Sequence, residues 1–219
     1  YILIYKDILL LTRSVEDFGV IIKPIVFTPL PFLGVDNFFS YKTICEILVI
    51  LFLWLSSDLA VHSVKKEGAM LNQLKNSSFN IVNIIYSKIT FTSIISVTIY
   101  FFMVIFMCLF SSFTFYQITI LGMCIIGIIV TTSTVRVSCA MLFAKEDNES
   151  DDRYSISLSF GGEVISYLLM LIASGIVVII SILSLYIASE IGSWISLLLF
   201  ILLLILNSVF VIMHLRYFT

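Results

Sequence analysis

Long apolar runs alternate with short polar segments along the chain. A helix needs about 20 mostly apolar residues to cross the hydrocarbon core of a bilayer. Runs of this kind predict six transmembrane helices, at 18–35, 43–61, 89–111, 118–144, 163–188 and 193–213. The first run departs most from the pattern, because it contains Lys23 and all three prolines. The pattern therefore predicts an all-α polytopic membrane protein.

The first fourteen residues follow a different pattern. Apolar blocks alternate with Lys6, Asp7 and Arg13 within 1–14. This arrangement is typical of an amphipathic helix that lies in the membrane interface instead of crossing it. We expect an interfacial helix at 1–14 followed by the six spans, with 1–219 forming a single transmembrane domain.

Composition excludes a soluble domain. The chain is 60% hydrophobic and 12% charged, with a mean hydropathy of +1.14, whereas soluble domains are about a quarter charged. A net charge of −2 gives no reason to expect nucleic acid as a partner. The four cysteines share no metal-type spacing and are interpreted as small buried apolar residues.

The distribution of Lys and Arg predicts the orientation. If the N-terminus is inside, only Lys42 faces outward and Lys23 lies within a span. All other basic residues then fall on the cytoplasmic side, namely Lys6, Arg13, Lys65, Lys66, Lys75, Lys88, Arg136, Lys145, Arg153 and Arg216. This is the positive-inside bias of short loops. It predicts that both termini are cytoplasmic and that Arg136 marks where the fourth span leaves the hydrocarbon. We expect the inner membrane of a prokaryote or an organelle, because the Ile-, Ser- and Tyr-rich composition fits an AT-rich genome.

One polar segment, "HSVKKEGAMLNQLKNSSF" at 62–79, stands between two apolar runs. It predicts a short cytoplasmic helix over 64–77. Val64, Met70, Leu71 and Leu74 can share one face, with Lys65, Lys66, Glu67 and Lys75 elsewhere. A helix held between two spans would transmit a push from a partner to both of them. The alternative is a solvated linker helix that lies on the membrane.

This order of interfacial helix, span, short outer loop, span and connector resembles the exporter-type permease superfamily of ABC transporters, which includes O-antigen, drug and haem exporters. In that superfamily the loop after the second span carries a Glu, a Gly, a Leu-rich turn, a break, and a Lys at the start of the third span. The matching residues here are Glu67, Gly68, Leu71, Leu74, Ser77, Ser78 and Lys88. The small size resembles the haem-exporter subunit of cytochrome c maturation, although "NSSFN" lacks a Pro and "AKEDNESDDRYS" is more acidic.

The resemblance implies a permease subunit that moves an amphipathic or apolar substrate outward. It implies coupling to a separate ATPase subunit through Lys65, Lys66, Glu67, Gly68, Met70, Leu71, Leu74 and Lys75. The chain contains no phosphate-binding loop, so we expect ATP and Mg on that partner and no enzyme activity here. The other expected partners are a second copy or a similar permease chain, and the lipid bilayer. The alternative function is a non-transport accessory or scaffold subunit.

Aromatic residues of the third span are candidates for a substrate path. Tyr100, Phe101 and Phe106 could face an apolar substrate, and the alternative is packing or lipid contact. "FGGE" at 160–163 is interpreted as a flexible segment leading into the fifth span, not as a phosphate loop.

Ionisable residues at membrane depth are also candidates, because they mark functional sites by default. Lys23, Asp58 and Glu163 qualify, and all are predicted near the inner boundary, where they can reach the headgroups. We expect Asp58 to pair with Lys65 or Lys66, and Glu163 to contact the second cytoplasmic loop. His62 and His214 are interpreted as packing residues near span ends.

Overall fold

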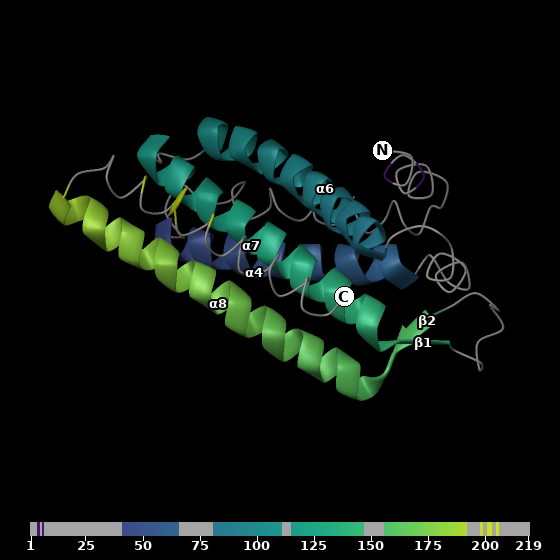
Figure 1. Cartoon of the computed structure of the whole chain (residues 1–219). Coiled ribbons are helices and arrows are strands. Elements are labelled where there is room, and N and C mark those ends of the chain that lie inside the picture. The colour runs from purple at the N-terminus through teal and green to yellow at the C-terminus, as the bar shows by residue number, and fades with distance from the viewer. Residues whose placement is uncertain are drawn as a thin grey trace.

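The computed structural model describes residues 4, 6, 41–65, 81–110, 115–146, 156–191, 198, 201–202 and 205. Four long helices account for most of this part of the chain (Figure 1). They are α4 (Tyr41–Lys65), α6 (Ile81–Phe110), α7 (Phe115–Phe143) and α8 (Phe160–Ile191). Two short strands, β1 (Ala144–Glu146) and β2 (Ile156–Leu158), join α7 to α8.

All four helices are long and apolar enough to cross a membrane. A helix satisfies its backbone hydrogen bonds internally, which is what a lipid environment requires. The four helices correspond to the spans predicted at 43–61, 89–111, 118–144 and 163–188, and the chain is an integral membrane protein. The interfacial helix at 1–14 and the span at 18–35 lie outside the described residues, except for Ile4 and Lys6, which are helical. The span at 193–213 is described only at four helical positions.

The helix boundaries differ from the predicted ones in three places. The helix α4 continues to Lys65, so Val64 and Lys65 form its last turn and do not begin a separate coupling helix. The helix α6 begins at Ile81, which places Lys88 two turns inside it. The helix α8 begins at Phe160, so "FGGE" is its first turn and not a flexible lead-in. The helices α6 and α8 each begin before the charged residue, Lys88 or Glu163, that stands at the start of the predicted span.

The helix α7 is the centre of the bundle. It packs against α8 on one side and against α4 and α6 on the other, and α4 also packs against α6 (Figure 1). Of the membrane-spanning stretch of α7, 67% is buried, compared with 28% for α8. The helix α8 is therefore the peripheral member of the described bundle.

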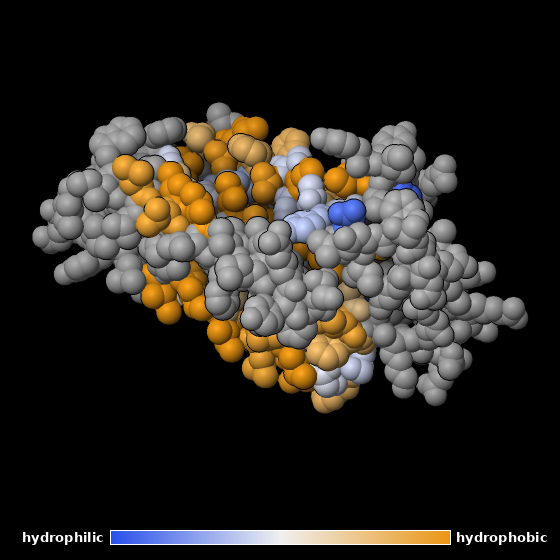
Figure 2. Space-filling view, viewed as in Figure 1, coloured by the Kyte–Doolittle hydropathy of each residue, from blue (hydrophilic) through white to orange (hydrophobic). Residues whose placement is uncertain are grey.

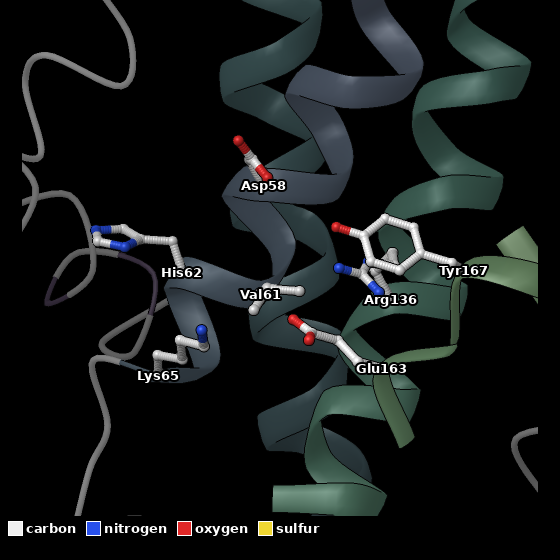
Figure 3. A pocket seen from close by; sticks show the side chains of 7 residues that line it. All are labelled: Asp58, Val61, His62, Lys65, Arg136, Glu163 and Tyr167. Atoms are coloured by element: carbon white, nitrogen blue, oxygen red, sulfur yellow. The ribbon is translucent and has the colours of Figure 1, made fainter. Parts of the chain in front are cut away.

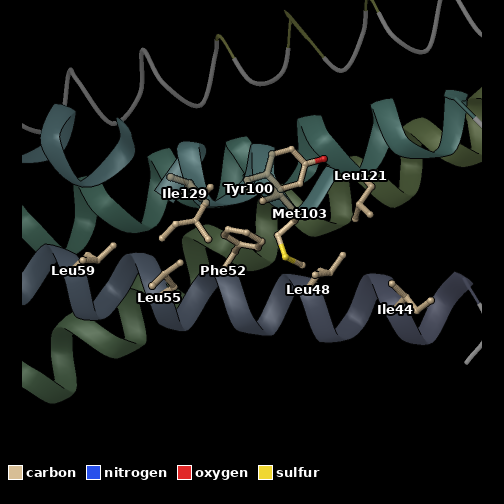
Figure 4. Packing of buried hydrophobic residues seen from close by; sticks show 11 residues of the cluster. Ile44, Leu48, Phe52, Leu55, Leu59, Tyr100, Met103, Leu121 and Ile129 are labelled. Carbon is tan, nitrogen blue, oxygen red and sulfur yellow. The ribbon is translucent and has the colours of Figure 1, made fainter. Parts of the chain in front are cut away.

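Two apolar clusters hold α4, α6 and α7 together. The first apolar cluster consists of Ile44, Leu48, Phe52, Leu55, Leu59, Ile99, Tyr100, Met103, Leu121, Ile125 and Ile129 (Figure 4). Within it, Phe52 and Tyr100 meet edge to face, with ring centroids 5.6 Å apart. The second apolar cluster consists of Ala60, Val64, Ile84, Val137, Ala140 and Met141. A smaller group, in which Cys124 and Ile128 of α7 contact Val177, attaches α8.

The described part of the connection between α7 and α8 consists of the two strands and a residue that caps α8. The strands pair antiparallel, with Ala144 opposite Leu158, a small departure from the predicted all-α fold. The Ser159 hydroxyl accepts a hydrogen bond from the Gly162 N–H at 3.2 Å, and the Ser159 carbonyl accepts one from the Glu163 N–H at 2.9 Å. Ser159 is thus the N-cap of α8. The cap fixes where Glu163 emerges beside α7.

Where its side chains are described, the surface of α8 is largely apolar (Figure 2). Its exposed side chains include Val164, Ile165, Leu168, Leu171, Ile172, Ile176 and Ile179. A soluble protein rarely exposes an apolar patch of this extent. The surface suits contact with lipid tails.

Candidate functional site

A cavity of about 210 Å³ lies where α4, α7 and α8 meet (Figure 3). Charged and polar side chains dominate its lining, which consists of Asp58, Val61, His62, Lys65, Arg136, Glu163 and Tyr167. The cavity lies at the end of the bundle where α4 ends and α8 begins. Five of the seven lining residues are acidic or basic, namely Asp58, His62, Lys65, Arg136 and Glu163. The helices that carry them are otherwise apolar.

Helical spacing explains why these residues share one cavity. On α4, Asp58, Val61 or His62, and Lys65 recur every three or four residues, so they lie on one face. On α8, Glu163 and Tyr167 are four residues apart and project in the same direction. Figure 3 shows the α4 residues on one side, the α8 residues on the other, and Arg136 of α7 next to Tyr167.

Arg136 is the most deeply buried charge in the cavity. Its side chain is 1% exposed. Its Nη1 donates a hydrogen bond of 2.7 Å to the Ser166 hydroxyl, and its guanidinium carbon lies 4.0 Å from the centre of the Tyr167 ring. Its Nε has no hydrogen-bond partner. The positive charge of a guanidinium is permanent in proteins, so this buried cation keeps a donor to offer.

The two carboxylates approach the cavity from different helices. Asp58 lies within electrostatic range of Arg136, His62 and Lys65. Within the described part of the chain, neither Asp58 nor Glu163 forms an ion pair of 4.0 Å or less with Arg136 or Lys65. The cavity therefore presents both signs of charge as separate groups. Of the two partners expected for Asp58, Lys65 forms no such pair, and Lys66 lies outside the described residues.

A polar layer adjoins the cavity on the interior side. On α6 and α7, buried polar residues fall between the first and second apolar clusters. Several of their hydroxyl groups are buried without a partner, namely those of Ser87, Thr92, Ser93, Ser96, Thr132 and Ser133. Lys88 belongs to the same stretch and is 2% exposed. Thr132 and Ser133 lie one turn before Arg136, so the layer continues the polar character of the cavity into the bundle.

The predicted coupling residues are only partly described. Lys65 is the last residue of α4 and lines the cavity. The other coupling residues, Lys66, Glu67, Gly68, Met70, Leu71, Leu74 and Lys75, lie outside the described residues. Their role stays a prediction.

The predicted substrate path is not brought together as a surface. Tyr100 is 3% exposed inside the first apolar cluster, whereas Phe101 is 61% exposed. Their ring centroids are 6.4 Å apart, but the two side chains occupy different environments. The side chain of Phe106 lies outside the described residues. A path along these aromatics stays a prediction.

The sequence alone does not single out Arg136, the most deeply buried residue of the cavity, as a site residue. That Arg136 marks where a span leaves the hydrocarbon stays a prediction, and the structure adds that the residue is enclosed by protein. Glu163 lines the cavity, and most of the second cytoplasmic loop, which we expect it to contact, lies outside the described residues. The rule that ionisable residues in spans mark functional sites applies to Arg136 as well and would have found it. Ser166 and Tyr167 carried no such signal, because only packing brings them to Arg136.

The chemistry of the cavity suits recognition. It combines guanidinium and ammonium donors, carboxylate acceptors and an aromatic face within one small volume. Among the described residues, no group of three or more His, Cys, Asp or Glu could hold a metal ion. Comparison with known proteins gives no match to any protein-family model, curated protein or solved structure.

Proposed function

We propose that this chain is the transmembrane permease subunit of an ATP-driven exporter. The observation that supports the proposal is the charged cavity around the buried Arg136 within membrane-spanning helices. Charges inside a membrane protein are costly, and they usually serve substrate or ion pathways. A subunit that only fills space in a complex gains nothing from such a cavity.

The position of the cavity suggests how a partner would act on it. Lys65 lines the cavity and is also the last residue of α4, directly before the segment that resembles a coupling helix. A push on that segment acts on α4, which carries Asp58 and Lys65. The opposite wall, with Glu163 and Tyr167, belongs to α8. Movement of α4 relative to α8 would change the cavity directly.

The proposed cycle follows from this connection. A separate ATPase subunit binds ATP and Mg and moves the connector after Lys65. Two permease chains, either identical or similar, enclose the path between them. The substrate is amphipathic or apolar and moves outward. The cavity faces the cytoplasmic side of the inner membrane of a prokaryote or an organelle, with both chain termini on that side.

The charge distribution supports this orientation. Lys65, Lys88, Arg136 and Lys145 all lie toward the end of the bundle that carries the cavity. Short loops with more Lys and Arg stay on the cytoplasmic side.

The alternative is an accessory or scaffold subunit of a membrane complex. The exposed apolar face of α8 favours this reading, because it could pack against another membrane subunit. Lipid would cover the same face equally well. The two functions differ in whether an ATPase binds the connector.

Purification in mild detergent, with mass spectrometry of the bound proteins, tests the proposal. We expect an ATPase with a phosphate-binding loop, and we expect Glu67→Arg and Leu71→Arg to release it. Glu46→Arg is the control, because Glu46 is an exposed acidic residue near the opposite end of α4. Recovery of other membrane subunits without an ATPase, unchanged by the connector variants, would favour the scaffold function.

A further inference from the structure

The charges that line the cavity also indicate what it binds. We propose that the cavity holds the headgroup of a zwitterionic amphiphile, in which a phosphate or carboxylate is joined to a primary amine. As a substrate assignment, this inference rests on the proposed function. As a binding site it stands alone, because binding does not require transport or an ATPase.

Arg136 is the anchor for the anionic end of the headgroup. A guanidinium has five N–H donors in a planar fork that matches the oxygens of phosphate and carboxylate. Here one nitrogen bonds Ser166 at 2.7 Å, while Nε has no partner although the residue is 1% exposed. Because Arg136 lines the cavity, an oxyanion there would receive charge-assisted hydrogen bonds from its guanidinium, and such bonds are among the stronger ones in proteins.

Asp58 and Glu163 select against a simple anion. Both carboxylates line the same cavity as Arg136, and a ligand with only negative charge would be repelled by them. A primary amine next to the anionic group reverses this repulsion, because its N–H groups donate to the carboxylates. A ligand with only positive charge meets the opposite difficulty at Arg136 and Lys65. The ligand that suits all four side chains carries both charges.

The size of the cavity limits what enters it. Sites for drug-sized ligands usually measure about 300–1,000 Å³, whereas this cavity measures about 210 Å³. It therefore admits a headgroup, and the acyl chains must lie outside it. Tyr167 lines the cavity and is itself 40% exposed, so the cavity lies next to the surface of α8. Val164 and Leu168, the exposed neighbours of Tyr167 on α8, offer apolar contact to such chains.

Native mass spectrometry of the purified full chain in detergent tests the inference. The probes are phosphatidylethanolamine, phosphatidylglycerol with the same acyl chains, and dodecylamine. They represent a zwitterionic, an anionic and a cationic amphiphile. We expect phosphatidylethanolamine to be retained about tenfold better than either of the others, because each of these leaves one set of charges without a partner.

Soluble glycerophosphoethanolamine, added as a competitor, distinguishes the source of the ligand. Displacement of the lipid would support recognition of the headgroup alone, as in a soluble metabolite. Retention of the lipid would support a membrane source, in which the acyl chains add to the affinity. Either result supports the proposed headgroup site when the substitutions described next weaken phosphatidylethanolamine binding.

Conservative variants keep the test independent of folding. Asp58→Asn and Glu163→Gln preserve size, and each is expected to weaken phosphatidylethanolamine binding about tenfold while leaving phosphatidylglycerol unchanged or better bound. Arg136→Lys keeps the charge but loses the fork, and it should weaken both phospholipids. Glu46→Gln, which lies far from the cavity on α4, should change neither.

Equal retention of phosphatidylethanolamine and phosphatidylglycerol would overturn the inference. Dodecylamine bound as well as phosphatidylethanolamine would overturn it too, since no anionic group would then be needed. Unchanged lipid binding in both Asp58→Asn and Glu163→Gln would do the same. None of these results depends on whether an ATPase is found with the chain, so failure here leaves the proposed function standing.

Discussion

The Arg136 guanidinium lies 4.0 Å from the centre of the Tyr167 ring and ties α7 to α8 within the bundle. The hydroxyl of Ser166, the residue before Tyr167 on α8, accepts a hydrogen bond of 2.7 Å from the same guanidinium. A buried cation is thus held by a ring and a hydroxyl. This pair of contacts explains how α8, the least buried of the four described spans, keeps its position beside the cavity.

The ring contact predicts different results for two substitutions of Tyr167. Tyr167→Phe keeps the aromatic face and should leave stability nearly unchanged. Tyr167→Leu removes it and should lower the free energy of unfolding by about 0.5–2 kcal/mol, the range of cation–π contacts. Thermal unfolding in detergent, followed by helical circular dichroism, measures both. Equal loss in the two variants would show that Arg136 gains nothing from the ring.

The loss of the Ser166 hydroxyl should destabilise the protein more than the loss of a hydroxyl usually does, because this hydroxyl bonds a charged group. Ser166→Ala leaves a buried guanidinium nitrogen without its acceptor, which should cost about 1.5–3 kcal/mol of stability. Ser174→Ala is the matched control on the same helix. The Ser174 hydroxyl donates to the Met170 carbonyl at 2.7 Å, inside its own helix, so its loss should matter little. Similar unfolding midpoints for the two variants would contradict the proposed importance of the Ser166 contact.

The helices α6 and α7 approach closely at Gly122. A Cβ at this position would lie 2.8 Å from the Tyr100 hydroxyl oxygen and 3.5 Å from the ring carbon that carries it. Gly122→Ala should therefore destabilise the protein by about 1–3 kcal/mol, as overpacking does. Tyr100→Phe removes the oxygen and should restore most of the loss.

A double-mutant cycle of Gly122→Ala and Tyr100→Phe measures this coupling directly. Contacting residues typically couple by about 0.5–3 kcal/mol. The cycle also separates the clash from the higher helix propensity of Ala. The propensity contributes equally with Tyr or Phe at position 100, so it cancels in the coupling energy. Strict additivity would mean that Tyr100 moves aside without cost.

Two adjacent glycines at the start of α8 predict opposite outcomes. A Cβ at Gly162 would lie 2.5 Å from the Phe143 Cβ, whereas a Cβ at Gly161 meets nothing within 4 Å. Gly162→Ala should force α7 and α8 apart and cost about 1–3 kcal/mol. Gly161→Ala should be neutral or add up to about 1 kcal/mol through helix propensity. Thermal unfolding of the two single variants compares them, and equal stability would contradict the close packing at Phe143.

Hydropathy predicted four of the helices because lipid offers no hydrogen bonds to the backbone. Any chain segment in the hydrocarbon must satisfy its own peptide groups, and a long apolar run does so as a helix. The same argument identified the membrane class from composition alone. Charges gave weaker information about helix ends, as Lys88 and Glu163 illustrate, because a helix can include a charged residue that finds a place in the protein.

The sequence by itself determined that this chain is a membrane protein and where four of its spans run. Only the tertiary structure decided which faces meet, and so placed Asp58, Arg136, Glu163 and Tyr167 around one cavity. Lipid tails and helix interiors are equally apolar, so hydropathy does not specify how each helix is rotated about its axis. That rotation depends on close approach and on buried polar contacts, such as Gly162 against Phe143 and Arg136 to Ser166. Those contacts join residues far apart along the chain, and they exist only once the helices have packed.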